Sequence, residues 1–239
     1  MLERLLLKLE LRDQLHPDER NALQAGFEGQ KWCAAGSDIV RQGSSPGEST
    51  LLLEGLTGRA VLLKDGSQQI TALHIPGDFV DLHSFLLLIM DHSVVALTDC
   101  TVAAIAHPRL RDLTTRYPHL GRLLWFSTLL DAAIHRQWLA AMGRRDALSQ
   151  LAHLLCELFL RLQVVGLTSD HTFELRLNQA QLADILGRSR ATVNSSVQVL
   201  RATRFVTWSG PLVRIEDWDA LVELAEFDPT YLQLGPAPV

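Results

Sequence analysis

Apolar positions change their spacing along the chain, and the changes divide it into regions. Residues 2 to 26 have apolar positions at helical spacing, with a break at His16-Pro17-Asp18 that suits a new helix start. From 30 to 106 the chain has short apolar or alternating runs separated by turn residues, which predicts an antiparallel sandwich or barrel. The runs that predict strands are 38–41, 50–53, 59–63, 69–73, 93–97 and 102–106.

Helical spacing returns from 110 to 141, where Pro118 suits a first helical turn. An apolar stripe follows at Leu123, Leu130, Ile134 and Trp138, with Ser127 and Ala141 completing the spacing. A long apolar stripe beside a β domain needs a partner surface, and we predict that it forms a coiled-coil dimer seam. The alternative is that the stripe packs only on its own β domain. Gly143-Arg144-Arg145 interrupts the stripe and marks the expected hinge and domain boundary.

The remaining chain has the pattern of a helix-turn-helix with flanking strands. Residues 147–162 form an apolar helix, 172–177 a short strand, 204–209 and 212–215 a two-stranded wing, and 218–227 a last helix. Between them, helical spacing stops at Gly187, and Ser189 is a good N-cap for a second helix. The polar face offers DNA-contacting candidates, with an ordinary helical hairpin as the alternative. The candidates are Gln179, Arg188, Ser189, Arg190, Thr192, Asn194, Ser195 and Gln198.

Composition narrows the classes of function. The net charge of −5 does not suit a bulk polyanion binder. Residues 143–215, however, contain nine basic and only five acidic residues, so this region is locally basic. The three cysteines are far apart and have no C-x-x-C, so they predict neither a disulfide framework nor a zinc or iron–sulfur site. No secretory signal is visible and the apolar run 85–90 is too short to cross a membrane, so a cytoplasmic protein is expected.

Four segments together carry a family resemblance: 38–43 (DIVRQG), Glu54-Gly55, 75–79 (IPGDF) and 187–200. With the order of elements, they make the chain resemble the cyclic-AMP receptor protein/Fnr family of bacterial transcription regulators. The resemblance implies an α+β fold with an N-terminal antiparallel, cyclic-nucleotide-binding-like β-roll (1–116), a dimerisation helix (117–142), a winged helix-turn-helix (143–231) and a flexible tail (232–239). It also implies a homodimer that binds double-stranded DNA and RNA polymerase.

The resembling segment departs from the family's cyclic-nucleotide binders. Gapless alignment from Gly77 puts Asp81-Leu82 where Gly-Glu holds the ribose, and His92-Ser93-Val94 where Arg-Ser-Ala holds the phosphate. Losing the bidentate guanidinium argues against cyclic AMP, and the absent cysteine cluster argues against a Fnr-type iron–sulfur cluster. The haem-containing, carbon-monoxide-sensing branch has a cysteine and a histidine here, and only the histidine, His83, is matched.

The sequence therefore decides neither the identity of the effector nor whether the protein has one. A haem bound through His83 is one alternative, and no other metal ligand is predicted. A second alternative is that Asp81 holds a neighbouring histidine protonated, so that an internal ion pair locks one conformer without any ligand. The expected effector pocket contains Asp81, His83, Ser84, His92, Ser93, His135 and Arg136.

The recognition segment also departs from the family, because Ala191 and Ser195 replace its usual glutamate and second arginine. We expect Arg190 to contact a base edge, and Arg188 and Ser189 to contact phosphate. The function favoured is a dimeric DNA-binding transcription regulator that senses a signal other than cyclic AMP. The alternatives are an adaptor whose C-terminal domain binds protein, and an enzyme built on His83, His92, His135 and Asp81. These histidines fall on different predicted elements and form no i, i+4 ligand pair, and no nucleophile motif accompanies them, so no enzyme is predicted.

Overall fold

The computed structural model describes residues 2–237, and it begins with two short helices, α1 (Glu3–Arg12) and α2 (Pro17–Gly26). The expected break between them is confirmed. Pro17 occupies the first turn of α2, and Glu19 accepts a hydrogen bond from the backbone nitrogen of His16, at 2.9 Å. The buried leucines of both helices pack beneath the β domain, which explains their amphipathic pattern.

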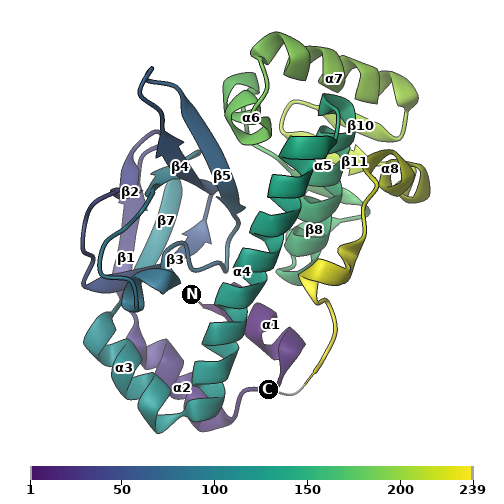
Figure 1. The fold of residues 1–239 in the computed structure, drawn as a ribbon. Helices are drawn as coiled ribbons and strands as arrows, with labels where there is room; N and C mark the ends of the chain where they lie inside the picture. Colours follow the sequence, from purple (N-terminus) through teal and green to yellow (C-terminus); the bar gives the residue numbers. More distant parts are fainter. Residues whose placement is uncertain (1, 238–239) are drawn as a thin grey trace.

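A β-roll of two antiparallel sheets follows, as the alternating runs predicted (Figure 1). One sheet has the order β1-β7-β3 and the other the order β2-β6-β4-β5. The short 3-10 helix η1 (Leu82–Phe85) lies between β5 and β6 in the chain. The strands are β1 (Glu28–Cys33), β2 (Asp38–Val40), β3 (Glu48–Glu54), β4 (Thr57–Leu62), β5 (Gln68–His74), β6 (Ser93–Ala96) and β7 (Cys100–Ala106).

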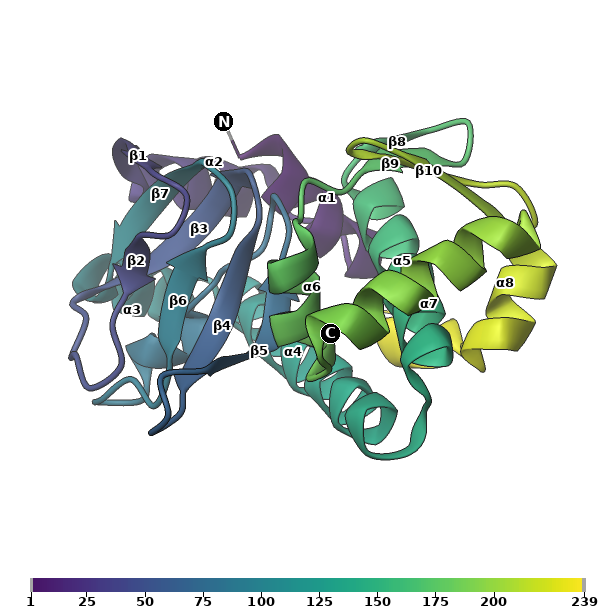
Figure 2. The ribbon, with the colours of Figure 1, turned by 90° about the horizontal axis from the view of Figure 1, so that it is seen from above.

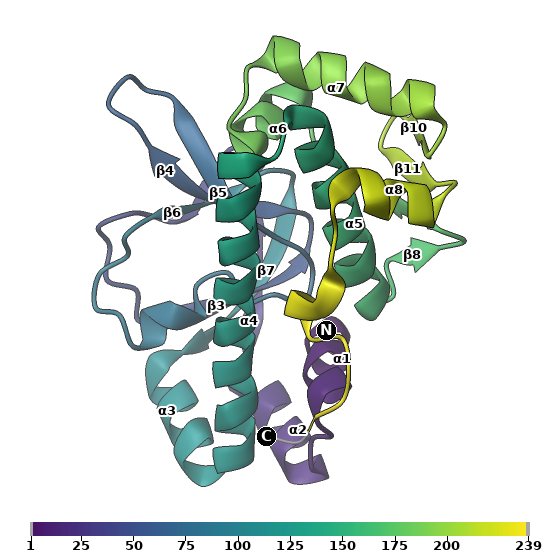
Figure 3. The same ribbon diagram turned by 45° about the vertical axis from the view of Figure 1, so that its right-hand side comes forward.

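Two helices lead out of the roll, α3 (His107–Arg116) and α4 (Pro118–Arg144). Tyr117 separates them, because the residue before a proline disfavours helical geometry. The long helix α4 runs between the roll and the C-terminal domain (Figures 1 and 3). Among its residues, those buried against the chain itself are Leu120, Leu123, Leu124, Ile134, Trp138 and Ala141.

The predicted dimer seam is therefore placed on the wrong face of α4. Leu123, Ile134 and Trp138 belong to the cores of this same chain, and Leu130 packs partly buried against one of them. They pack on the C-terminal domain as well as on the roll, so the alternative that the stripe packs only on its own β domain is not confirmed either.

The C-terminal domain combines four helices with a four-stranded sheet of order β10-β11-β9-β8. The wing strands β10 and β11 pair as expected, and β9 joins them to form the larger sheet (Figure 2). Its elements are α5 (Ala147–Val164), β8 (Thr168–Ser169), β9 (Thr172–Glu174), α6 (Gln179–Leu186), α7 (Arg190–Thr203), β10 (Val206–Ser209), β11 (Leu212–Ile215), α8 (Trp218–Ala225) and the 3-10 helix η2 (Pro229–Leu232).

The two domains share one hydrophobic core. Ile70 and Leu73 of the roll belong to the same buried cluster as Leu151 of α5, with Trp138 of α4 between them. The expected hinge lies slightly further along the chain, because α4 continues to Arg144 and α5 begins after its N-cap at 146.

The tail is more ordered than expected from residue 232. Leu232 is buried, and the backbone nitrogen of Ala237 donates to the carbonyl of Arg12 at 3.0 Å. The end of the expected tail, 238–239, lies outside the described residues. Across 2–237, no helix is both long enough and apolar enough to span a bilayer.

Candidate functional site

The helix-turn-helix is built as its local signals require. Asn178 caps α6 by accepting a hydrogen bond from the backbone nitrogen of Gln181 at 2.9 Å. Gly187 ends α6 with φ +62, in the left-handed region that favours glycine. Ser189 then caps α7, since its hydroxyl oxygen accepts from the backbone nitrogen of Thr192 at 3.1 Å. These caps fix the angle at which α7 leaves the turn.

One face of α7 is buried and the opposite face is polar and open. Val193, Ser196, Val197 and Leu200 pack inward. Figure 2, which views the molecule from above, shows α7 crossing in front of α5 with no described element over it. The sequence-predicted residues on the open face are Ser189, Arg190, Thr192, Asn194, Ser195 and Gln198, all exposed.

Some of these polar groups are held in place by hydrogen bonds to neighbouring side chains. Gln179 of α6 donates to the side-chain oxygen of Asn194 at 3.0 Å, which orients that amide on the helix surface. Arg190 has no hydrogen-bond or ion-pair partner among residues 2–237, and it is exposed at the first turn of α7. Its guanidinium can therefore reach outward from the helix N-terminus.

Arg188 does not face outward as expected. It is half-buried, and its guanidinium donates to the carbonyl of Arg145 at 2.8 Å and to the Gln150 side chain at 3.2 Å. It thus ties the helix-turn-helix to the start of α5. In this arrangement Arg188 supports the turn rather than offering its charge to a phosphate.

The first helix of the pair, α6, is docked on the roll. Gln69 of β5 donates to the backbone oxygen of Asp184 at 2.7 Å, and Gln68 donates to its carboxylate at 2.9 Å. Gln181 donates in the other direction, to the carbonyl of Leu97, at 2.6 Å. The helix-turn-helix is thus held on the roll through α6, while the outer face of α7 stays open.

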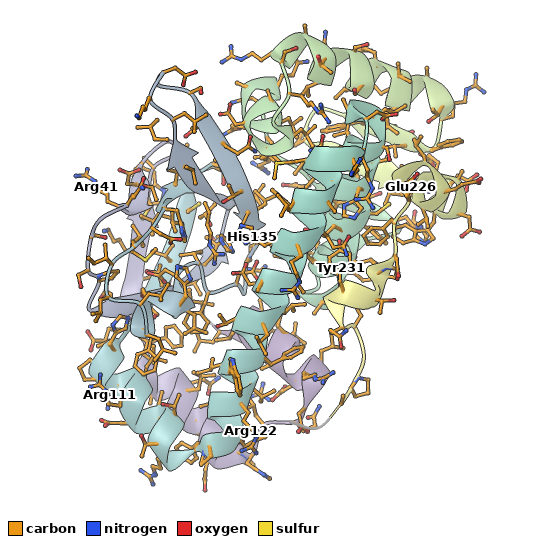
Figure 4. All side chains as sticks on the ribbon, viewed as in Figure 1. Arg41, Arg111, Arg122, His135, Glu226 and Tyr231 are labelled. Atoms are coloured by element: carbon orange, nitrogen blue, oxygen red, sulfur yellow. The ribbon has the colours of Figure 1, made fainter. Side chains whose placement is uncertain are left out.

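A narrow cavity of about 40 Å³ lies between the roll and α4, where the effector pocket was expected. Figure 4 shows His135 on the side of α4 that faces the roll. The cavity is far smaller than the roughly 300–1,000 Å³ of ligand pockets. It is lined by Lys8, Arg59, His74, Asp78, Phe79, Leu82, His83, Ser127, Thr128, Leu130, Asp131, Ile134 and Arg161.

Asp81 does not line this cavity, although the gapless alignment placed it there. Its buried carboxylate turns to β3 and accepts hydrogen bonds from the backbone nitrogen of Thr50 at 2.5 Å and the Thr50 hydroxyl at 3.4 Å. Burial raises the pKa of Asp81 to about 7, against the effect of these bonds. The expected ion pair between Asp81 and a protonated histidine is therefore wrong: Asp81 fastens η1 to the roll.

The two serines and Arg136 also lie away from the cavity lining. The Ser84 hydroxyl lies 3.3 Å from Nε2 of His107, and the Ser93 hydroxyl accepts from the backbone nitrogen of Gln42 at 3.0 Å. Arg136 is exposed on α4. These three residues therefore belong to local structure or to the surface.

An arginine that the sequence analysis overlooked brings a buried charge to the cavity lining. Arg59 of β4 is 5% exposed, and its guanidinium pairs with Asp131 of α4 at 2.6 Å. A buried charge requires such a partner. Its signal in the sequence is an arginine inside the otherwise uncharged strand TGRAVL. The pair joins the roll to α4 across the cavity.

The expected histidines do gather here. The rings of His83 and His92 lie 5.1 Å apart between centroids. Burial, reinforced by the charge of Arg59, lowers the pKa of both, that of His83 to about 4. His135 of α4 has its pKa lowered by the same two causes. These shifts favour the neutral form of all three imidazoles, of which only that of His83 is part of the cavity lining.

A buried polar network joins the cavity to the C-terminal domain. Arg161 of α5 donates to Asp78 of the roll at 2.9 Å, to the Leu73 carbonyl at 2.8 Å and to Glu157 at 2.9 Å. Lys8 of α1 also pairs with Asp78. Glu157 in turn accepts from Trp138 of α4 and Tyr231 of η2, whose position is labelled in Figure 4. Removing Arg161 takes one charged partner from each of two buried carboxylates.

A second apolar stripe on α4 faces solvent. Trp125, Leu129 and Leu139 are 65%, 52% and 71% exposed. Trp125 and Leu139 are two heptads apart, so they lie along one side of the helix. Arg136 lies on the same exposed side. In Figure 3 this side of α4 is open along most of its length.

Both halves of the chain match known protein families. The family described as "Crp-like helix-turn-helix domain" matches residues 149–224, and the family described as "cyclic nucleotide-binding domain" matches residues 30–117. The transcriptional activator protein FnrL of Cereibacter sphaeroides is 28% identical over 200 residues, covering 81% of this chain and 79% of the relative. The transcriptional activator protein anr of Pseudomonas aeruginosa is 24% identical, covering 80% and 78%.

Solved structures agree on the fold. The chain is similar to FixK2 from Bradyrhizobium japonicum, with a TM-score of 0.75, 21% identity and coverage of 82% of this chain and 96% of that one. A CooA variant from Carboxydothermus hydrogenoformans gives a TM-score of 0.66 at 17% identity, covering 91% and 99%. The expected order of β-roll, long helix and helix-turn-helix domain is thereby confirmed.

Proposed function

The chain belongs to the Crp/Fnr family of transcription regulators, and we propose that it works as a dimer whose two α7 helices each read one DNA half-site. The observation that carries this proposal is the outward face of α7. That face is polar and capped by Ser189, and it offers the unpartnered Arg190 at its first turn. A helix N-terminus carrying short polar groups and one arginine suits entry into a major groove.

Four polar residues of the turn and of α7 have a defined part in this proposal. Arg190 makes a bidentate contact with a guanine edge, and Asn194, oriented by Gln179, contacts a neighbouring base. Ser189 contributes to phosphate binding at the helix start. Arg188 positions the turn through Arg145 and Gln150.

The dimer forms through the exposed stripe of α4 rather than through the stripe first predicted. Trp125, Leu129 and Leu139 supply the apolar surface that two parallel or crossing helices bury against each other. Two-fold symmetry then gives two α7 helices for a two-fold operator. The protein acts on transcription in the cytoplasm, through RNA polymerase bound near the operator.

The signal sensed by the roll is not a cyclic nucleotide. His92 and Ser93 occupy the positions that hold the phosphate in nucleotide-binding members of the family, and Asp81 is committed to Thr50. The two guanidinium groups that line the cavity are already paired, that of Arg59 with Asp131 and that of Arg161 with Asp78 and Glu157. The residues present therefore do not fit a cyclic phosphate and ribose.

DNA binding is tested with fragments of the source genome, selected for affinity and measured by gel shift over a range of salt concentrations. A specific dimer gives a preferred sequence with two-fold symmetry and an affinity that falls steeply with salt. Equal affinity for all fragments at every salt concentration contradicts the proposal. Calorimetric titration with cyclic AMP and cyclic GMP is expected to show no heat, and micromolar binding that depends on His92 contradicts the assignment of the signal.

A further inference from the structure

Three potential metal ligands meet at the edge of the roll, beside η1. One donor atom each from His83, Asp91 and His92 lies within 4.8 Å of the other two. His83 belongs to η1, while Asp91 and His92 immediately precede β6. The sequence analysis placed the two histidines in one pocket but did not include Asp91.

The two imidazoles have donor atoms without a use in the fold. Nε2 of His83 and Nε2 of His92 are both buried and have no hydrogen-bond partner in the described chain. His92 is only 9% exposed. Buried polar atoms are usually satisfied, so two orphaned nitrogens side by side indicate a missing ligand. Burial lowers the pKa of both side chains, which favours the neutral form that binds metal.

Asp91 adds the carboxylate that a histidine site commonly uses. Its Oδ1 lies 2.7 Å from Nδ1 of His92. A carboxylate on Nδ1 fixes the ring orientation and leaves Nε2 as the free donor. The Asp91 side chain is also 77% exposed, so a cation has a path from solvent to the site.

From this geometry we propose that His83, His92 and Asp91 form a binding site for a divalent first-row transition metal, with Zn²⁺ as the reference ion. Imidazole nitrogens with a carboxylate oxygen suit such ions rather than Ca²⁺ or Mg²⁺. Zinc–nitrogen bonds of about 2.0–2.1 Å set ligands roughly 3.3 Å apart, so small side-chain rotations close the site.

Nearby positive charge does not prevent this. Arg59 lowers the proton affinity of both histidines, but Asp131 balances it at 2.6 Å. Asp91 supplies further negative charge at the open side. Among these ligands only His83 lines the adjoining cavity, whose volume of about 40 Å³ is far below that of a pocket for a large ligand such as haem.

The site has a structural consequence, because its ligands flank one loop. Segment 86–89 lies between His83 and Asp91, and its four apolar side chains (Leu86, Leu87, Leu88 and Ile89) are 51% to 83% exposed. A bound ion fastens both ends of this loop beside α4. An effect of the ion on DNA affinity rests on the proposed function. The ion site itself does not depend on that function.

Metal binding is tested on the full chain, without DNA, by calorimetric titration with Zn²⁺. One ion per chain is expected. His83→Gln and His92→Gln should weaken binding at least about 100-fold, and Asp91→Asn about 10–100-fold. His107→Gln is the matched control, because this histidine lies close to η1 but outside the cluster, and it should bind Zn²⁺ unchanged.

Co²⁺ provides a second measurement that needs no variant. The unaltered protein should give visible bands of a nitrogen- and oxygen-ligated ion, without the intense thiolate charge transfer that the three cysteines would cause. Absence of stoichiometric Zn²⁺ binding, thiolate bands, or equal affinity in all the histidine variants overturns the site. If Zn²⁺ binds but no DNA sequence is preferred, the site stands and the proposed function fails.

Discussion

Replacing Arg161 with methionine tests whether the buried polar network holds the roll and the C-terminal domain together. Methionine keeps much of the apolar stem and removes only the guanidinium. That group makes three hydrogen bonds, to Asp78, Leu73 and Glu157, two of them to buried carboxylates on different domains.

The size of the effect follows from what remains around the two carboxylates. Removing one partner of a buried ion pair typically costs about 3–5 kcal/mol. Asp78 keeps Lys8, and Glu157 keeps the donors of Trp138 and Tyr231. Because neither carboxylate is left entirely alone, we expect Arg161→Met to cost about 3 kcal/mol, the lower end of that range.

Urea unfolding measures this cost. A loss of about 3 kcal/mol lowers the midpoint by roughly 1–1.5 M if the slope is about 2–3 kcal/mol/M. The control is Arg176→Met, which removes an arginine paired with Glu174 on the surface of the same domain and should leave the midpoint unchanged. If Arg161→Met shifts the midpoint no more than the control does, the network does not stabilise the domain contact.

Three further changes test other parts of the structure. Arg190→Ala should lower affinity for the preferred DNA site by about 1–3 kcal/mol and relax the preference at one base pair, measured by gel shift; an unchanged preference refutes the register of α7. Leu139→Arg should produce monomers in sedimentation, whereas Leu62→Arg, at an equally exposed leucine of β4, should not; a dimeric Leu139→Arg excludes the exposed stripe of α4 as the seam. The hydrogen bond between His119 and Glu19 raises the pKa of His119, although burial opposes this. The same bond lowers the pKa of Glu19, again against the effect of burial. Stability from His119 is therefore complete below its ordinary pKa of 6.5 and lost as pH rises through the higher folded value, while that from Glu19 is lost as pH falls below 4.5. His119→Gln should consequently destabilise more at pH about 5.5 than at about 8.5 in urea unfolding, and an equal loss contradicts the pairing.

Local signals were enough to predict most elements of the fold. Gly187 and Ser189 act through their own backbone and near neighbours, so the turn and both caps are readable from a few residues. The strand β1 was not predicted, because it lacks such local signals. All its residues except Cys33 are exposed, including the apolar Trp32, so no alternation marks it, and only its pairing with β7 makes it a strand.

The face of α4 that meets a partner could not be chosen from spacing alone. The helix has apolar residues on two sides, one including Ile134 and Trp138 and the other including Trp125 and Leu139. Either stripe fits a helical period. Only the position of α5 and the roll, set by contacts distant in sequence, decides which stripe this chain buries itself.

The candidate site shows the same limit. Alignment correctly brought His83 and His92 together, because both lie on the loop between β5 and β6. It misplaced Asp81. The direction of this side chain is decided by its hydrogen bond to the backbone nitrogen of Thr50, which lies on β3 and is distant in the sequence. Arg59 and Asp131 were overlooked because their pairing joins β4 to α4 across a long sequence separation.

If the roll senses a signal in the cavity, as proposed above, that signal reaches the DNA-binding domain through side chains that join the two. Asp78 and Arg161 line the cavity, and the same two side chains pair the roll with α5. A ligand can shift the domain arrangement only if it interacts differently with two states of that arrangement. Any ligand that draws Asp78, Arg59 or Asp131 toward itself meets this condition, because each of these groups already holds one element to another. The route from cavity to α7 then runs through α5 and through the contact of α6 with Gln69, without a separate transmitting element.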